Sequence, residues 1–352
     1  TAPELQILKF VPASGAATRM FKDWFGLLER RDLSPEVEPA LLHFAETIHA
    51  YAFRTNLEQA LRAGKIDLDE YLRQGKLKEI MAFILGKDGL NYGNLPKALL
   101  IFHQYADKSR TALEEHFVEA AGYARSHGDI CRLHFTVSEE FQKAVAGHVG
   151  RVIDGYQQQY RTRFQVDFSI QKPSTNTLAV DLENRPFRND QDRLVFRPAG
   201  HGALLYNLND LDADLVFIKN IDNVAHDRLL PEAIPYKKAL AGYLLTLQKQ
   251  IFSYLDVLSD PDIAVKTIEE IRDYCSKNLQ LSIPVHFSGR SPHEQKEILF
   301  HLLNRPIRIC GMVKNTGEPG GGPFWVADEQ GQATRQIIEQ FQIDAQDAEQ
   351  LR

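Results

Sequence analysis

The beginning of the chain limits the possible folds more than any other segment. Residues 5–11 form a short apolar run of β-prone residues, and they lead directly into the small-residue stretch PASGAATRM at residues 12–20. The natural interpretation is a strand, a tight loop and then a helix from Arg19 to about Leu28. This order of elements is typical of an α/β fold and predicts a buried first strand.

The same alternation recurs further along the chain. Strand-like runs lie at residues 132–137, 164–170, 215–218 and 307–313, and helical patterns lie around residues 113–120 and 145–160. Ser138 stands where its side chain can cap the start of the second of these helices. Strands that alternate with helices predict a mostly parallel or mixed sheet covered on both faces, in a three-layer α/β/α arrangement.

A helical insertion is expected within this α/β body. Between residues 35 and 86 apolar residues recur at helical spacing, as at Leu41, Phe44 and Ile48, and charged residues occupy the other faces. We predict an insertion over residues 23–88, packed beside the ligand site, within an α/β domain of residues 1–330. Residues 331–352 are expected to begin a C-terminal extension.

Charge and composition exclude several classes of protein. The 41 basic residues are outnumbered by 47 acidic ones, so the net charge of −6 argues against a general nucleic-acid binder. No apolar run approaches the length of a membrane span. The 3 cysteines lie far apart, which argues against a disulfide framework or a thiolate zinc site. We expect a cytoplasmic protein without nucleic-acid or membrane partners; the sequence leaves the oligomeric state open.

The loop after the first strand is the first candidate site. It contains the small residues Ala13, Ser14, Gly15, Ala16, Ala17 and Thr18. Small side chains let the backbone approach a ligand, and consecutive amide groups at a helix start bind anions. Arg19 adds a forked, permanently charged donor suited to phosphate oxygens. The alternative is a closely packed strand–helix turn with Arg19 on the surface.

Three later segments also carry groups suited to chemistry. Pro96 precedes Lys97 and restricts the backbone that presents its ammonium group. Asp222, in Asn220–Asn223, follows the strand at 215–218, where open α/β sheets bind ligands, and could supply a carboxylate to Mg²⁺. Glu318 lies in a glycine-rich loop at residues 317–323 and could accept hydrogen bonds from sugar hydroxyls. A structural turn or a mobile surface loop explains each segment as an alternative.

A fourth segment places a histidine between two glycines, Gly200-His201-Gly202. Glycine on both sides suggests a loop that runs against something flat or bulky. No other histidine or cysteine stands at ligand spacing nearby, so we expect His201 to act through loop shape and ligand contact, not as a metal ligand.

The order of these motifs resembles the UDP-sugar pyrophosphorylase branch of the sugar nucleotidyltransferases. That family has L-x-G-G-x-G-T-R-[LM], a downstream P-K, a Gln after an alternating strand, a G-H-G or G-N-G loop and N-x-D-N. Here the corresponding residues are the Thr18-Arg19 loop, Pro96-Lys97, Gln171, Gly200–Gly202 and Asn220–Asn223. The chain looks like a bacterial domain of unknown function built on this scaffold. The resemblance covers about residues 5–326 and implies a GT-A-like nucleotide-diphospho-sugar transferase fold.

The resemblance also implies roles for individual residues. Nucleotide contacts are expected from Ala13, Ser14, Gly15, Ala16, Thr18, Gln171, Gly200, His201 and Gly202. Arg19 and Lys97 would be the catalytic residues, and Asp222 would hold Mg²⁺. Sugar contacts are expected from Asn220, Glu318 and Gly320.

The activity that follows is the joining of a sugar 1-phosphate to a nucleoside triphosphate, expected to be UTP, with release of pyrophosphate. Two alternatives stay open. One is a glycosyltransferase that consumes a nucleotide sugar on the same scaffold. The other is a catalytically inactive nucleotide or nucleotide-sugar binding protein, which is favoured by the replacement of two family glycines by Ser14 and Ala17.

Overall fold

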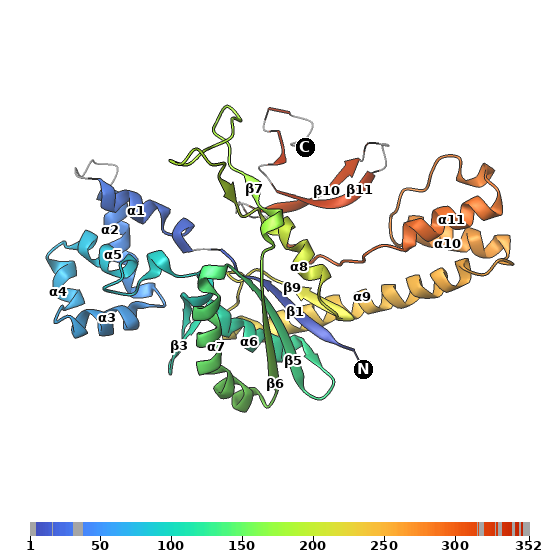
Figure 1. The fold of residues 1–352 in the computed structure, drawn as a ribbon. Helices are drawn as coiled ribbons and strands as arrows, with labels where there is room; N and C mark the ends of the chain where they lie inside the picture. The colour runs from blue at the N-terminus through green and yellow to red at the C-terminus, as the bar shows by residue number, and fades with distance from the viewer. Residues whose placement is uncertain are drawn as a thin grey trace. The chain divides into compact units, whose positions relative to one another are not determined.

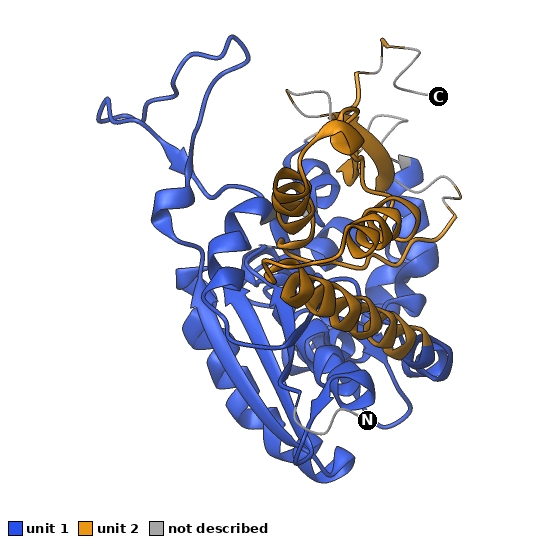
Figure 2. Ribbon diagram, turned by 90° about the vertical axis from the view of Figure 1, so that its right-hand side faces the viewer, with its two compact units in different colours: residues 1–235 blue, residues 236–352 orange. Residues whose placement is uncertain are grey.

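The computed structural model describes residues 5–15, 17–30, 38–314, 316, 320–327, 329, 333–339, 342–344 and 346–347. The chain forms two compact units, residues 1–235 and 236–352 (Figure 2). The division between the units falls within a long helix, after Pro235.

A mainly parallel sheet forms the centre of the first unit (Figure 1). Its parallel strands run in the order β6 (Arg163–Ile170), β5 (Ile130–Val137), β1 (Ile7–Pro12) and β9 (Leu215–Ile218). The short strand β4 (Arg125–Ser126) pairs antiparallel with the start of β5. The expectation of a mixed α/β fold is confirmed, and the parallel strands end at a common edge.

Alternating side chains of β1 enter two different cores. Helices α6 (Ala112–Tyr123) and α7 (Glu139–Tyr160) share one core with Val11, and Phe117 is fully buried in it. On the other side Leu8 and Phe10 pack against Leu204, just before the short helix α8 (Leu205–Asn209). Burial on both sides explains why β1 is a nearly continuous apolar run.

The two long helices begin differently. Thr111 caps α6 through a capping box with Glu114, in which each side chain accepts from the other's backbone N–H. Ser138 is the N-cap residue of α7 as predicted, but its hydroxyl caps no backbone N–H and has no hydrogen-bond partner among the described residues. The prediction of a side-chain cap was therefore wrong, although the position of the helix start was right.

Five helices follow β1 in the described part of residues 22–88, which matches the range predicted as an insertion to within one residue. They are α1 (Lys22–Glu29), α2 (Glu38–Thr47), α3 (Arg54–Ala63), α4 (Leu68–Arg73) and α5 (Leu77–Leu85). The described part of residues 22–88 contains no strand. Leu57, Leu61 and Ile84 are among the residues of a core that is distinct from the core under α6 and α7. The described part of the unit also contains two small hairpins: β2 (Ile101–Gln104) with β3 (Ser109–Thr111), and β7 (Thr177–Leu178) with β8 (Phe196–Arg197).

The described part of the second unit contains helices and one hairpin. Helix α9 (Leu230–Leu258) leads into it, followed by α10 (Val265–Lys277) and α11 (Pro292–Leu303). Residues 307–313, predicted as a strand, form none, because no neighbouring strand pairs with them among the described residues. The hairpin is built instead by β10 (Gly321–Ala327) and β11 (Ala333–Glu339). No helix in the described ranges combines the length and apolarity that a membrane span requires.

Two glycines, one within α1 and one just after α5, allow a matched test of how the helices after β1 pack. A Cβ atom built on Gly89 would lie 1.8 Å from the carbonyl oxygen of Phe83, whereas a Cβ on Gly26, within α1, would meet nothing within 4 Å. We expect Gly89→Ala to lower the free energy of unfolding by about 1–3 kcal/mol, because the backbone must shift. Gly26→Ala should raise it by up to about 1 kcal/mol, because alanine favours the helix. Urea denaturation measures both changes, and equal stabilities of the two variants would contradict the packing described.

Candidate functional site

Three segments that are distant in sequence meet where the parallel strands end. The loop after β9 joins the end of β1, since the Ile221 N–H donates to the Pro12 carbonyl at 3.1 Å. The segment at residues 95–97 lies against the loop after β1. There the Lys97 N–H donates to the Gly15 carbonyl at 3.2 Å, and the Ala17 N–H donates to the Leu95 carbonyl, also at 3.2 Å.

An ion pair connects these segments through their side chains. Lys97 Nζ lies 2.6 Å from Asp222 Oδ2, and the two side chains are 22% and 36% exposed. A Cβ built on Gly15 would lie 3.9 Å from Cδ and Cε of Lys97, so the loop after β1 borders the aliphatic part of the same side chain. The structure thus brings together Gly15, Lys97 and Asp222, from three of the motifs singled out in the sequence, with water access to both charges.

The rest of the small-residue loop is partly described. Ala13 is buried, and its N–H donates to the Thr136 carbonyl at 2.9 Å, which ties the loop to the end of β5. Ser14 is half-buried and Thr18 is exposed. The backbone of Arg19 belongs to a short 3-10 helix (Ala17–Arg19). Ala16 and the side chain of Arg19, both expected at the site, lie outside the described part of the chain.

The residues expected to recognise the base follow β6 and precede α8. Gln171 is half-buried, and its amide donates to the Thr175 hydroxyl at 3.2 Å, within its own loop. A Cβ on Gly200 or Gly202 would meet no atom within 4 Å, so packing does not require glycine at either position. His201 begins a short 3-10 helix (His201–Leu204), and its side chain lies outside the described part.

The expected sugar and metal contacts are only partly placed. Asn220 is exposed beside Asp222, and its carbonyl accepts from the Asn223 N–H at 3.1 Å. Glu318 is outside the described residues, and Gly320 is an exposed residue of the second unit. No group of three or more metal-binding side chains occurs in the described ranges. Asp222 alone therefore offers a single carboxylate, which suits Mg²⁺ when substrate phosphates and water supply the other ligands.

A buried ionic network beneath the site was missed by the sequence reasoning. Lys9 of β1 is fully buried, and its Nζ lies 2.8 Å from Glu119 Oε2 of α6. Lys219, directly after β9, contacts the other oxygen of the same carboxylate at 2.5 Å. A lysine in the middle of an apolar strand was the one visible signal, because such a residue is rarely buried without a partner.

His116 of α6 belongs to the same region. Its Nε2 lies 3.2 Å from the Ile221 carbonyl oxygen, so Nε2 carries the proton and donates it. Its Nδ1 has no hydrogen-bond partner among the described residues. Burial, and next the nearby ammonium group of Lys9, hold the pKa of His116 well below its usual value. His116 is therefore neutral at pH 7 and supports the loop that carries Asp222.

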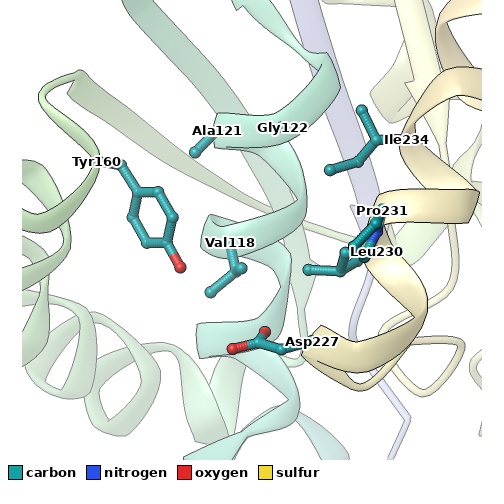
Figure 3. A pocket seen from close by; sticks show the side chains of 8 residues that line it. All are labelled: Val118, Ala121, Gly122, Tyr160, Asp227, Leu230, Pro231 and Ile234. Carbon is teal, nitrogen blue, oxygen red and sulfur yellow. The ribbon is translucent and has the colours of Figure 1, made fainter.

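A small pocket lies elsewhere in the first unit (Figure 3). Its volume is about 260 Å³, and its walls come from α6, the end of α7 and the start of α9. The lining residues are Val118, Ala121, Gly122, Tyr160, Asp227, Leu230, Pro231 and Ile234. Asp227 is paired with the buried Arg110 at 2.6 Å, so its charge is already compensated. The pocket shares no lining residue with the Lys97–Asp222 site.

The shifted pKa of His116 predicts a pH dependence of stability. Below about pH 6.5 the unfolded chain binds a proton on this side chain that the folded chain does not bind. The free energy of unfolding should therefore fall with acidification, by up to about 1.4 kcal/mol per pH unit between pH 6 and pH 5. His116→Gln keeps an N–H donor for Ile221 and removes the titration, so its stability should depend less on pH in this range. Denaturant unfolding at both pH values measures the slopes, and equal slopes would contradict the assignment.

Comparisons with known proteins place the chain in a family. No curated protein and no solved structure matches it. A family model described as "Domain of unknown function (DUF4301)" matches residues 1–352. The chain therefore belongs to the DUF4301 family.

Proposed function

We propose that this protein is a sugar-phosphate nucleotidyltransferase with a GT-A-like fold that acts in the cytoplasm. It would join a sugar 1-phosphate to a nucleoside triphosphate, with UTP the first nucleotide to test, and release pyrophosphate. The proposal rests on the resemblance of the motif order to UDP-sugar pyrophosphorylases. One observation carries it further: Gly15, Lys97 and Asp222 meet at the carboxyl edge of a parallel sheet.

That edge is where open α/β sheets bind their ligands. Contacts between residues 15, 97 and 222 are not imposed by sequence proximity, so their meeting supports a shared role. A backbone loop of small residues, an ammonium group and a carboxylate are suited to phosphates and to a phosphate-bound cation. Each of the two side chains has solvent access and can exchange its present partner for a ligand.

In the proposed reaction a phosphate oxygen of the sugar 1-phosphate attacks the α-phosphorus of the nucleoside triphosphate. The bond between the α-phosphorus and the bridging oxygen breaks, and pyrophosphate leaves with the bonding electrons. Such a displacement needs positioning and charge neutralisation and no covalent nucleophile. Lys97 and Arg19 would bind the leaving pyrophosphate, and the loop at residues 13–18 would bind the triphosphate. Mg²⁺ held by Asp222 would neutralise negative charge on the phosphates when bound.

The ion pair between Lys97 and Asp222 makes both residues testable. Lys97→Ala should lower kcat by about two to three powers of ten, the scale seen when one preorganised charge-stabilising group is lost. Asp222→Ala should abolish metal-dependent turnover. Both variants should remain folded, because neither side chain is buried. The measurement is pyrophosphate release from UTP and a panel of sugar 1-phosphates with Mg²⁺.

A second lysine–aspartate pair provides the control. Lys277 and Asp273 lie 2.7 Å apart on α10, in the second unit. Lys277→Ala and Asp273→Ala remove the same groups and should leave turnover unchanged. Release of a nucleoside diphosphate from a nucleotide sugar would instead identify a glycosyltransferase. A rise in melting temperature with nucleotides, without turnover over the whole panel, would identify a binding protein.

A further inference from the structure

The loop that carries Asp222 is held at both ends by one oxygen atom. Glu119 Oε1 accepts from Lys219 Nζ at 2.5 Å, just after β9, and from the Ala225 N–H at 3.3 Å. Asp222 lies between these two attachment points. The loop at residues 219–225 is thus bound to helix α6 on either side of Asp222, the candidate ligand-binding carboxylate.

Glu119 is itself fixed by its other oxygen. Oε2 accepts from Lys9 Nζ at 2.8 Å and from the Tyr123 hydroxyl at 3.0 Å. The carboxylate is 1% exposed and Lys9 is fully buried. Burial alone would raise the pKa of Glu119, but the ammonium groups of Lys9 and Lys219 hold it below its usual range. The carboxylate therefore stays charged and keeps its partners at neutral pH.

Stability alone is a poor reason for such a network. A buried ion pair costs so much desolvation that apolar residues of similar volume often stabilise a fold equally well or better. A network of fixed hydrogen bonds does, however, determine where the connected backbone lies. Here the connected backbone carries Asp222, whose carboxylate must reach both Lys97 and a ligand.

We propose that Glu119, acting through Lys219 and the Ala225 amide, is the positioning residue for Asp222. Its role in catalysis rests on the proposed function, but its control of the loop does not. When one of these two hydrogen bonds is removed, the segment between residues 219 and 225 opens more often. Asp222 then spends less time in the position from which it can bind a phosphate-bound cation. A displacement of about 1 Å at a reacting centre can lower a rate roughly 100-fold.

Lys219→Met is the variant of choice, because Glu119→Gln would leave Lys9 buried without its carboxylate partner and could prevent folding. Lys172→Met is the matched control. Lys172 also follows a strand of the sheet, β6, but pairs with the exposed Asp210 at 2.7 Å. Lys219→Arg keeps a charged donor for Glu119 and serves as the conservative rescue.

Amide hydrogen exchange of residues 219–225 tests the positioning without any assay of activity. We expect exchange on the order of tenfold faster in Lys219→Met, unchanged exchange in Lys172→Met, and largely restored protection in Lys219→Arg. Unchanged exchange in Lys219→Met would overturn the proposal. So would equally fast exchange in Lys219→Arg, because it would assign the effect to the side chain's shape and not to its hydrogen bond.

Steady-state kinetics then separate this inference from the proposed function. With turnover in the wild type, Lys219→Met should lower kcat by roughly 10- to 100-fold with little change in the KM of the nucleotide. An unchanged kcat together with faster exchange would overturn the positioning of Asp222. Absence of turnover in the wild type would overturn the proposed function, and the exchange data would still decide whether Glu119 holds the loop.

Discussion

The ion pair between Lys9 and Glu119 holds the central strand of the sheet against a helix that covers it. The position of the loops at the carboxyl edge of the sheet depends on this packing. Lys9 lies in the central strand β1, and Glu119 lies in helix α6, which covers one face of the sheet. An ammonium group within an apolar strand can be buried only opposite a charged partner, so β1 and α6 must pack in the register that brings the two together. The same carboxylate binds Lys219 after β9, which links two strands, a helix and a loop through one group.

Helices α1–α5 begin and end beside the candidate site. The segments that flank them are connected by the hydrogen bond from the Ala17 N–H to the Leu95 carbonyl. Helices α1–α5 bury a core that is distinct from the core under α6 and α7. Gly15 and Lys97 lie next to each other despite the long segment between them.

The sequence predicted the strands of the sheet well, because strands of a parallel sheet are apolar runs with sharp ends. The runs at 132–137, 164–170 and 215–218 correspond to β5, β6 and β9 to within two residues. The apolar run at 307–313 has a similar pattern but no partner strand among the described residues, and Gly321–Ala327 beyond it form β10 instead. Pairing is a property of two segments, so the composition of one cannot decide it. The Glu119 network was missed for a related reason, since buried charges follow no periodic pattern.

The sequence by itself determined the local elements and the chemical character of the separate motifs, because apolar periodicity, small-residue loops and isolated charges are properties of neighbouring residues. It also predicted Lys97 and Asp222 as candidate ligand-binding residues. Only the tertiary structure decided that these two residues contact each other, that Lys97 contacts Gly15, and that Glu119 holds the loop that carries Asp222. The reason is that contacts between distant residues depend on strand order and helix register, which are fixed by the packing of the whole unit.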